Sequence, residues 1–543
     1  MSRSIREFQR IRRTAETGAI PQGRGGALSV CLIYPNRYYT AMSSLGFQTV
    51  YRLFNDQPDI VCERAFLPDR DELVEYGKSG TTLLSMESGR PVSDFDVIAF
   101  SISFEPDFIN IPHILRLARI PELASERDHS HPLVIAGGAA CFINPEPVAE
   151  FFDLLVIGEG EALIPQLSAL LCGSSGQNRN ELLVIAAGLP GIYVPSLPPI
   201  EPVQRLVAPA NAPPSSSVVL TDDTEFSNMF LVEVSRGCPR GCRFCAAGFV
   251  WQPFRQQCLE QLQQICIEGL KLRDTIGLVG AAVSDHADIE ELSRFIVEQG
   301  GKVSLSSLRL DRLTPGMLEL LVKSGHKTVS LAPEGGSQRM RDMIRKNLTE
   351  QQILEAVEMV ARAGILNLKL YFIIGLPGET DDDLHELVRM TSAIQAVVVG
   401  QARAHKRLGE ITLSINPFIP KPSTPLQWSG MTPLQELKQK VALLEKQVRP
   451  IANVRLKVEE LQGCVLQSLL SRGGRELTPL IRLMADGLNL RKAAKTLKMD
   501  PEACVTANLP LDGHLPWDIL RTTDNKHLQA EYRAAMQVIG VRP

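Results

Sequence analysis

The sequence predicts an α/β protein with an N-terminal doubly wound (Rossmann-like) domain, a parallel barrel or part of one, and a mainly helical C-terminal region. Three observations predict it. The chain has 543 residues, too many for one ordinary core. Apolar runs of strand length alternate with helix-length segments in two successive series. Amphipathic patterns rich in Leu, Lys and Arg follow. The expected boundaries are a tail at 1–27, an α/β domain at 28–196, a linker at 197–227, the barrel at 228–430 and the helical region at 431–543.

The first series begins with the apolar run ALSVCLIYPN at Ala27, followed by the helical pattern SSLGFQTVYRLFN. Further strand-like runs are DFDVIAFSIS, HPLVIAGGAA and FFDLLVIGEGE. Gly137 and Gly138 end one of these runs, and Gly158 ends another. These glycines are therefore expected at the carboxyl edge of a parallel sheet, where open α/β folds hold ligands.

The second series follows a stretch rich in Pro, Ser and Ala that includes PANAPPSSS and is expected to be an interdomain linker. Its strands are expected in MFLVEVSRGC, TIGLVGAAV, GKVSLSSLRL, KTVSLAPEGG, NLKLYFIIGLPGE and EITLSINPFIPK. Six parallel strands fit a barrel or part of one, with chemistry at their C-terminal ends. Beyond Met431 we expect helices to about residue 500, less regular structure afterwards, and a solvated basic face at Arg472, Arg475 and Arg482.

Composition excludes some classes of protein. The net charge of −4, from 57 basic and 61 acidic residues, gives no general attraction to nucleic acid. No predominantly apolar run reaches the ~18 residues of a membrane span. Eleven cysteines, mostly scattered singly, do not form a disulfide pattern. Together these features predict a cytoplasmic protein without a membrane partner.

Three cysteines stand apart from the others. Cys238, Cys242 and Cys245 have the spacing C-x3-C-x2-C directly after the strand run LVEV. Three thiolates on one loop can bind three irons of a cubane cluster and leave the fourth iron open to a chelating ligand. The alternatives are a zinc site, for which Cys258 is the nearest further ligand, and inert core thiols.

The cysteine spacing, with Phe244 just before the third cysteine, resembles the signature of the radical S-adenosylmethionine (SAM) superfamily. That resemblance implies a partial (β/α)6 barrel of the TIM type and a [4Fe–4S] cluster whose open iron is chelated by SAM. It further implies an external low-potential electron donor. Reductive cleavage of SAM then gives methionine and a 5′-deoxyadenosyl radical that abstracts hydrogen.

Other strand-end motifs extend this resemblance. In LYFIIGLPGET, Ile373 and Gly375 would lie along the adenine of SAM, and the backbone near Asn416 in SINPFIPKPSTPLQW would face it. Glu334 in SLAPEGGS would meet the ribose hydroxyls. Each motif also has a purely structural interpretation, since GLPGE is a common strand-to-helix corner and Glu334 can be an N-cap.

The second strand of the barrel departs from the family pattern. It reads GAAVSDH where the family has Gly-Gly-Glu to hold the SAM amine. Asp285 or His286 can substitute, or both are ordinary polar loop residues. Arg309 matches a carboxylate in shape, so it is expected to bind either the SAM carboxylate or Asp311.

The N-terminal domain resembles the cobalamin-binding-like domain that precedes the barrel in one radical SAM class. The resemblance rests on the AGG at Gly137 and Gly138, the NPEP after it, and FDLLVIGEGE with Gly158. The run Ser43, Ser44, Leu45 and Gly46 echoes a Ser-x-Leu element of the cobalamin signature. The stretch YPNRYYTAMSSLG lacks the histidine that ligates cobalt in that signature. Either cobalamin binds without a protein histidine, or the domain has lost this cofactor.

From the N-terminal domain through the barrel to the start of the C-terminal region, the chain resembles uncharacterised bacterial radical SAM proteins with this fused architecture, a group that implies no substrate. The first hypothesis is a radical SAM enzyme acting on carbon, and a methyltransferase if cobalamin binds. The second is a cobalamin-free methylthiotransferase or rearrangement enzyme. The third is a non-enzymatic Fe–S redox regulator or scaffold. No residue is assigned as a catalytic acid, base or radical carrier.

Overall fold

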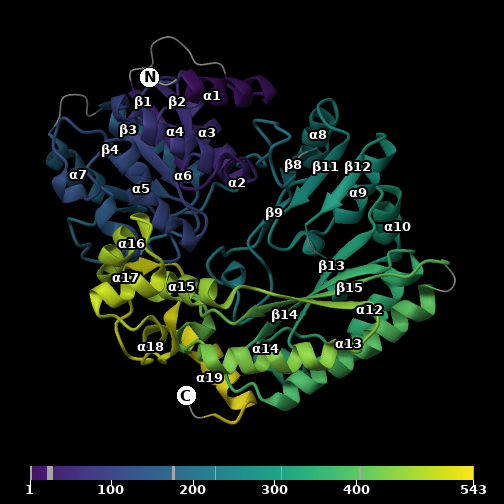
Figure 1. Cartoon of the computed structure of the whole chain (residues 1–543). Coiled ribbons are helices and arrows are strands. Elements are labelled where there is room, and N and C mark those ends of the chain that lie inside the picture. The colour runs from purple at the N-terminus through teal and green to yellow at the C-terminus, as the bar shows by residue number, and fades with distance from the viewer. Residues whose placement is uncertain are drawn as a thin grey trace. The chain divides into compact units, whose positions relative to one another are not determined.

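The computed structural model describes residues 3–20, 28–173, 178–226, 228–306, 308–402 and 405–541 (Figure 1). Positions 1, 2 and 21–27 of the expected tail lie outside these ranges. The chain divides into two compact units. Unit 1 contains Met1–Asn228, Leu470–Asp500 and His514–Thr522. Unit 2 contains Met229–Leu469, Pro501–Gly513 and Thr523–Pro543.

Unit 1 is built on a six-stranded sheet with the order β2-β1-β3-β4-β5-β6. All neighbouring pairs are parallel except β5 and β6. Because β1 lies between β2 and β3, the chain reverses its direction of winding there, as in a doubly wound fold. The sheet confirms the predicted fold class. Its strands are β1 (Leu28–Tyr34), β2 (Ile60–Phe66), β3 (Val97–Ser101), β4 (Leu133–Gly137), β5 (Leu154–Val156) and β6 (Ile192–Tyr193).

Helices cover this sheet. The apolar cluster on one face joins alternate residues of β1, such as Val30 and Leu32, to Phe47 and Leu163 of two helices. In Figure 1 the yellow-green helix α16 lies beside α5, although the two are far apart in the sequence. The helices of unit 1 are α1 (Arg3–Ala15), α2 (Tyr38–Met42), α3 (Leu45–Asn55), α4 (Arg70–Ser79), α5 (Asn110–Leu117), α6 (Gly160–Gly173), α7 (Arg179–Ala187), α16 (Thr478–Ala485) and α17 (Leu490–Leu497).

The segment expected to be a linker packs on unit 1. The backbone N–H groups of Val218 and Val219 both donate to Oε1 of Gln48. Within the same segment, β7 (Val203–Gln204) pairs with β17 (Leu520–Arg521). The described part of this segment is therefore held by hydrogen bonds within unit 1, and the predicted domain boundaries stay a prediction.

Unit 2 contains two parallel sheets, β12-β11-β8 and β13-β14-β15-β16. A parallel bridge between Leu308 and Leu331 connects them. The six predicted strands are all present, and β16 is an additional one. Such a curved parallel array is part of a (β/α) barrel. The strands are β8 (Met229–Glu233), β11 (Thr275–Val279), β12 (Lys302–Leu305), β13 (Thr328–Glu334), β14 (Asn367–Ile374), β15 (Ile411–Pro417) and β16 (Val454–Val458).

Helices of unit 2 follow the strands and continue into the C-terminal region. The expectation of less regular structure after residue 500 is wrong for α19, a helix of 14 residues near the C-terminus. The helices are α8 (Leu259–Leu270), α9 (Ile289–Glu298), α10 (Pro315–Lys323), α11 (Gln338–Met343), α12 (Glu350–Arg362), α13 (Asp381–Ala402), α14 (Leu434–Val448), α15 (Leu461–Arg472, which crosses into unit 1), α18 (Pro501–Thr506) and α19 (Asn525–Val538).

The expected solvated basic face of the C-terminal region is also corrected. Arg472 is 7% exposed. Arg475 and Arg482 each form an ion pair, with Glu146 at 2.9 Å and with Glu122 at 2.7 Å. These arginines therefore hold C-terminal segments onto unit 1. Among the helices that the structure describes, none is long and apolar enough to cross a membrane.

Candidate functional site

Cys238, Cys242 and Cys245 lie on one loop at the C-terminal end of β8, and residues 238–245 are called the cluster loop below. The loop leaves from β9 (Ser235–Arg236), and the chain returns through β10 (Arg255–Gln256), which pairs with β9 in antiparallel fashion. All three thiols are free, with Cys242 buried and the other two half-buried. The barrel therefore presents three thiols at the strand end where such folds carry their chemistry.

Close backbone contacts fix the shape of this loop. Gly237 has a φ of +80°, and a Cβ added there would lie 2.2 Å from the carbonyl oxygen of Trp251. A Cβ on Gly248 would lie 2.3 Å from the carbonyl oxygen of Arg240. The Gln252 side-chain amide donates to the carbonyls of Cys238, at 2.7 Å, and Gly248, at 2.8 Å. Only glycine fits at both positions.

The three thiols on one loop are a donor set that fits a cubane cluster, because each thiolate binds a different iron and the fourth iron is left open. Burial raises the pKa of Cys245 to about 11, so binding of iron would displace its proton. These three cysteines would hold the cluster.

Asp285 lies beside this loop, at the end of a 3-10 turn (Val283–Asp285) after β11. Its side chain is 2% exposed, and Oδ1 lies 3.1 Å from Nε of Arg240 and 3.4 Å from Nε of Arg312. Oδ2 lies 3.7 Å from Nε of Arg309 and receives no hydrogen bond from any residue that the structure describes. A buried carboxylate oxygen without a hydrogen bond is a candidate acceptor for a bound cation.

Two other residues near Asp285 are already engaged. Arg309 donates to both oxygens of Asp311, at 3.0 and 3.1 Å, which is the structural ion pair considered from the sequence. His286 is paired at both ring nitrogens, through Nε2 with the Gln257 carbonyl and through Nδ1 with the Asp288 N–H. Of the two residues considered for the SAM amine, Asp285 therefore has an oxygen, Oδ2, that can still accept a hydrogen bond.

The adenine-facing residues expected from the motifs lie on neighbouring strands. Ile373 of β14 is the direct parallel partner of Asn416 of β15. Gly375 has a φ of +71°, and a Cβ on it would lie 2.8 Å from Leu437. Its N–H donates to Glu379 at 2.7 Å. The structure thus brings Ile373 and Asn416 together, whereas Gly375 is surrounded by its own chain at the strand-to-helix corner.

Two further predicted residues stand at the cluster end of the barrel. Glu334 ends β13 with a φ of +66°, which is uncommon for a residue other than glycine. Burial raises the pKa of Glu334, and Lys346, whose Nζ lies 3.4 Å from Oε1, partly opposes this. Phe244 is half-buried within the cluster loop. Besides burial, the charge of Glu334 contributes to the raised pKa of Cys245, so Glu334 lies on the cluster side of the barrel.

Two of the glycines expected to approach cobalamin in unit 1 are packed against their own chain. A Cβ on Gly138, whose φ is +105°, would lie 2.5 Å from the carbonyl oxygen of Ile102. A Cβ on Gly158, whose φ is +138°, would lie 2.3 Å from that of Leu206. Their small size is therefore needed by the fold itself, and their role toward cobalamin stays a prediction.

The remaining residues of that set are at the carboxyl edge of the sheet. Ser44 is the N-cap of α3 and accepts from the Phe47 N–H at 3.3 Å. A Cβ on Gly46 would meet nothing closer than 3.9 Å, and one on Gly137 would make ordinary contact with Val156 at 3.5 Å. All three positions lie at the edge where ligands of such sheets bind, and Gly46 also has open space at its Cβ.

Sequence reasoning missed Asp107, which lies just beyond β3 at the same edge. Burial raises the pKa of Asp107 to about 7, partly opposed by a 2.7 Å hydrogen bond from Asn36. Asp107 is 4% exposed. The only signal in the sequence was its place after a strand run, which by itself does not separate a buried acid from a solvated one.

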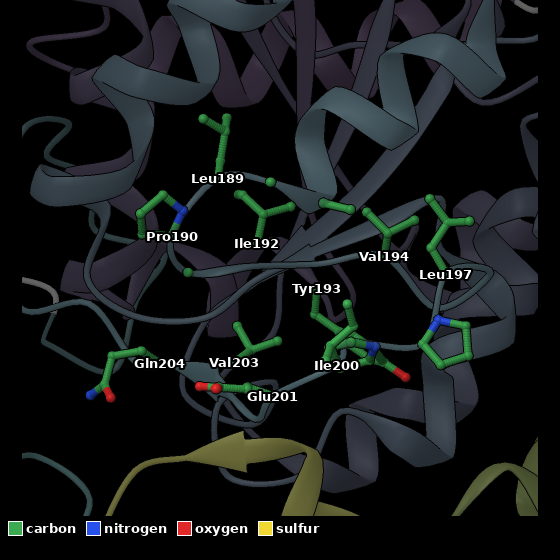
Figure 2. Close-up of a pocket in the computed structure, with 15 residues that line it drawn as sticks. Leu189, Pro190, Ile192, Tyr193, Val194, Leu197, Ile200, Glu201, Val203 and Gln204 are labelled. Carbon is green, nitrogen blue, oxygen red and sulfur yellow. The ribbon is translucent and has the colours of Figure 1, made fainter.

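A separate pocket of about 480 Å³ lies in unit 1. Figure 2 shows that it is lined by mainly apolar side chains on the segment from Ala187 to Gln204, with Glu201 and Gln204 as polar exceptions. None of the residues predicted to bind cobalamin lines it. We therefore assign this pocket no part in the cofactor site.

Comparisons with known proteins agree with these features. The family described as "Radical SAM proteins, N-terminal" matches residues 46–195, and the one described as "Radical SAM superfamily" matches residues 232–391. An uncharacterized protein of Methanocaldococcus jannaschii is 27% identical over 477 residues, which cover 86% of this chain and 94% of the relative.

Two solved structures share the fold over most of the chain. The methyltransferase TsrM from Kitasatospora setae, solved with tryptophan and a SAM analogue, has a TM-score of 0.53 at 13% identity and covers 87% of this chain and 99% of TsrM. The cobalamin-dependent enzyme OxsB, solved with aqua-cobalamin and SAM, has a TM-score of 0.50 at 13% identity. The match covers 94% of this chain and 79% of OxsB. With its three-cysteine loop and both domain matches, this chain belongs to the radical SAM superfamily and is an enzyme of that family, which implies a [4Fe–4S] cluster, SAM and a reductant.

Proposed function

We propose that this radical SAM enzyme methylates an unactivated carbon and uses cobalamin bound to unit 1. The observation that carries the proposal is the parallel sheet of unit 1, whose winding reverses between β1 and β3, in the same chain as the three-thiol loop. Ligands of doubly wound sheets bind at that point of reversal. Gly46, near the start of α3, leaves room at this edge of the sheet. The likeness of the fold to TsrM and OxsB supports the same assignment.

The chain's own residues bind and orient the cofactors in this proposal. The three cysteines hold the cluster, and the free Oδ2 of Asp285 accepts hydrogen bonds from the SAM ammonium group. Ile373 and Asn416 would hold the adenine of SAM through their backbones, and Glu334 would bind its ribose hydroxyls. When bound, the cluster and SAM supply the electron and the 5′-deoxyadenosyl radical, and cobalamin supplies the methyl group.

The remaining expectations belong to the same proposal. The enzyme works in the cytoplasm, where its scattered cysteines stay reduced. An external low-potential donor supplies the electron. The formal net charge of −4 indicates no nucleic acid as the partner.

The test is anaerobic reconstitution followed by measurement of iron, sulfide and cobalamin on one sample. We expect iron and sulfide in the amounts of one [4Fe–4S] cluster per chain, together with the absorption bands of a corrin. Addition of dithionite and SAM should release 5′-deoxyadenosine. The variant carrying Cys238→Ala, Cys242→Ala and Cys245→Ala should lose iron and 5′-deoxyadenosine but keep the corrin. Enzyme that forms 5′-deoxyadenosine without taking up cobalamin would refute the methyltransferase assignment alone. Zinc in place of iron would refute the cluster as well.

A further inference from the structure

Arg243 lies in the cluster loop between the second and third cysteines. Its side chain is 9% exposed. Nη1 donates to the carbonyls of Met343, at 2.8 Å, and Asp342, at 3.3 Å, at the end of α11. The backbone N–H of Arg243 donates to the carbonyl of Ile344 at 2.9 Å. The middle of the cluster loop is therefore attached to the turn after α11 by both its backbone and its side chain.

The charge of Arg243 is neutralised from the far end of the chain. Glu531 of α19 accepts from Nε of Arg243 through Oε2 at 2.9 Å. Its other oxygen, Oε1, accepts from Nη1 of Arg345 at 2.6 Å. The Glu531 side chain is 17% exposed. One part-buried carboxylate thus bridges two guanidinium groups, an arrangement of strong charge-assisted hydrogen bonds.

Arg345 also contacts the cluster loop. A Cβ added to Gly241 would lie 3.2 Å from Nη1 of Arg345, so this guanidinium packs against the backbone one residue before Cys242. Arg345 itself has a φ of +54°, which the turn after α11 imposes on it. Arg243 therefore follows Cys242 directly in the chain, and the guanidinium group of Arg345 packs against Gly241, the residue before Cys242.

The C-terminal segment has further contacts with the chain that follows the cluster loop. The hydroxyl of Thr523 donates to the carbonyl of Phe249 at 3.0 Å. The rings of His527 and Phe249 lie 6.2 Å apart, and Tyr532 packs edge-on against Trp428 at 5.6 Å. These contacts fix the position of α19, so Glu531 is held in place independently of its own ion pairs.

We infer that Glu531 is a positioning residue for the [4Fe–4S] cluster, which it serves by fixing the loop around Cys242 and by neutralising Arg243 and Arg345. A cubane held by thiolates carries negative charge, and groups around it set its reduction potential. Two uncompensated guanidinium groups, one carried by the cluster loop and one packed against it, would stabilise the reduced cluster. With Glu531 present, the cluster keeps the low potential that SAM cleavage requires. This inference rests on the cluster alone and is independent of cobalamin and of methyl transfer.

The experiment is a redox titration of reconstituted full-length enzyme without SAM, followed by the electron paramagnetic resonance signal of the reduced cluster. Glu531→Gln keeps the shape of the side chain and removes its charge. We expect its midpoint potential to shift to a less negative value, whereas Glu531→Asp, which keeps the charge, shifts less. The signal comes only from assembled clusters, so the potential can be measured even where a variant holds less iron.

Two further variants separate charge compensation from a merely structural role. Arg345→Met in the Glu531→Gln background removes one uncompensated cation and should return the midpoint toward the wild-type value. Arg533→Gln changes an exposed charge on the same helix and should leave it unchanged. A midpoint in Glu531→Gln equal to that of wild type, or an equal shift in Arg533→Gln, would overturn the inference. Neither result bears on the presence of the cluster or of cobalamin.

Discussion

Asp285 contacts three guanidinium groups near the cluster loop and still keeps Oδ2 without a hydrogen bond from the described residues. Asp285→Asn keeps the shape of the side chain and replaces one of its two acceptor oxygens by an NH2 donor. A hydrogen bond to a charged group contributes about 1.5–3 kcal/mol, so SAM affinity should fall by roughly ten- to a hundredfold. The measurement is calorimetric titration of SAM into reconstituted enzyme, with iron content determined on the same sample.

Asp311→Asn is the matched control for that variant. Asp311 belongs to the same cluster of charges, but both of its oxygens already accept from Arg309. We expect a smaller loss of SAM affinity. If Asp311→Asn weakens binding of SAM more than Asp285→Asn does, the ammonium group is held elsewhere and the assignment of Asp285 is wrong.

Asp107 predicts a pH dependence. Its folded-state pKa of about 7 lies above the ordinary 3.8 because the carboxyl group is buried. The folded protein therefore holds this proton more tightly than the unfolded chain, and the resulting stability is full below about pH 3.8 and is lost as the pH rises through 7. The loss amounts to at most about 4 kcal/mol.

Asp107→Asn removes this titration and keeps an acceptor for Asn36. Between pH 5 and pH 8 the melting temperature of wild type should fall relative to that of the variant. Thermal unfolding at several pH values measures it, with the exposed Asp71→Asn as a control. Parallel curves for wild type and Asp107→Asn would show that the carboxyl group is ionised without cost in the folded protein.

Individual site residues differ in how far the sequence can predict them. The cysteine spacing alone predicts a cluster-binding site, since three thiols on one short loop rarely serve any other purpose. The choice of Arg309 between SAM and Asp311 depends on side-chain positions that no spacing encodes. Glu531 lies 288 residues beyond Arg243, so no local pattern links the two.

At the scale of elements, the strands predicted from continuous apolar runs are all present, and two of those missed, β2 and β16, have interrupted patterns. In β2 the buried Glu63 and Arg64 interrupt the run. Arg64 is neutralised by Glu16 and Glu87, at 2.7 and 2.6 Å, which a reading of local hydropathy cannot anticipate. The strand β16 has the sequence VRLKV, in which charged residues alternate with apolar ones and are exposed.

The glycines at the strand ends of unit 1 should behave in two different ways. Gly138→Ala forces a side chain into a positive φ and against the Ile102 carbonyl, so it should cost at least about 2 kcal/mol of stability. Gly46→Ala lies near the start of α3 in open space and should stabilise by up to about 1 kcal/mol. Thermal unfolding without cofactor measures both effects.

Cobalamin content then tests which glycine faces the ligand. If the start of α3 approaches the corrin, Gly46→Ala should lower the cobalamin bound while its stability is unchanged or higher. Gly137→Ala, with ordinary contacts at its Cβ, is the matched comparison for Gly138→Ala. A stable Gly138→Ala protein that fails to take up cobalamin would show that this glycine serves the ligand after all.

At the scale of the whole molecule, the C-terminal region does not form a unit of its own. Its segments Leu470–Asp500 and His514–Thr522 pack in unit 1, and the rest of it packs in unit 2. Helical periodicity predicted helices up to about residue 500 and missed α19, and it contains no information about which apolar face each helix covers. In unit 1, Leu480 and Ile481 of α16 are fully buried.

This division predicts that residues 1–228 are incomplete by themselves. Without the later segments they lose the 2.9 Å ion pair of Glu146 with Arg475 and the 2.7 Å pair of Glu122 with Arg482, together with the apolar cover of α16. The side-chain amide of Asn144, which is 2% exposed, would lose the carbonyls of Ser471 and Gly473 as partners. Loss of that burial and of these partners should cost several kcal/mol.

The fragment 1–228 should therefore melt well below the full chain and be cut rapidly by protease. Co-expression with residues 470–522 should restore protection, because this piece supplies α16, Arg475 and Arg482, and the two pieces should co-purify. Arg475→Ala in the shorter piece should weaken that association, since it removes the partner of Glu146 and of the Tyr193 hydroxyl. If fragment 1–228 resists protease as well as the full chain does, the C-terminal segments are not needed for the stability of this domain.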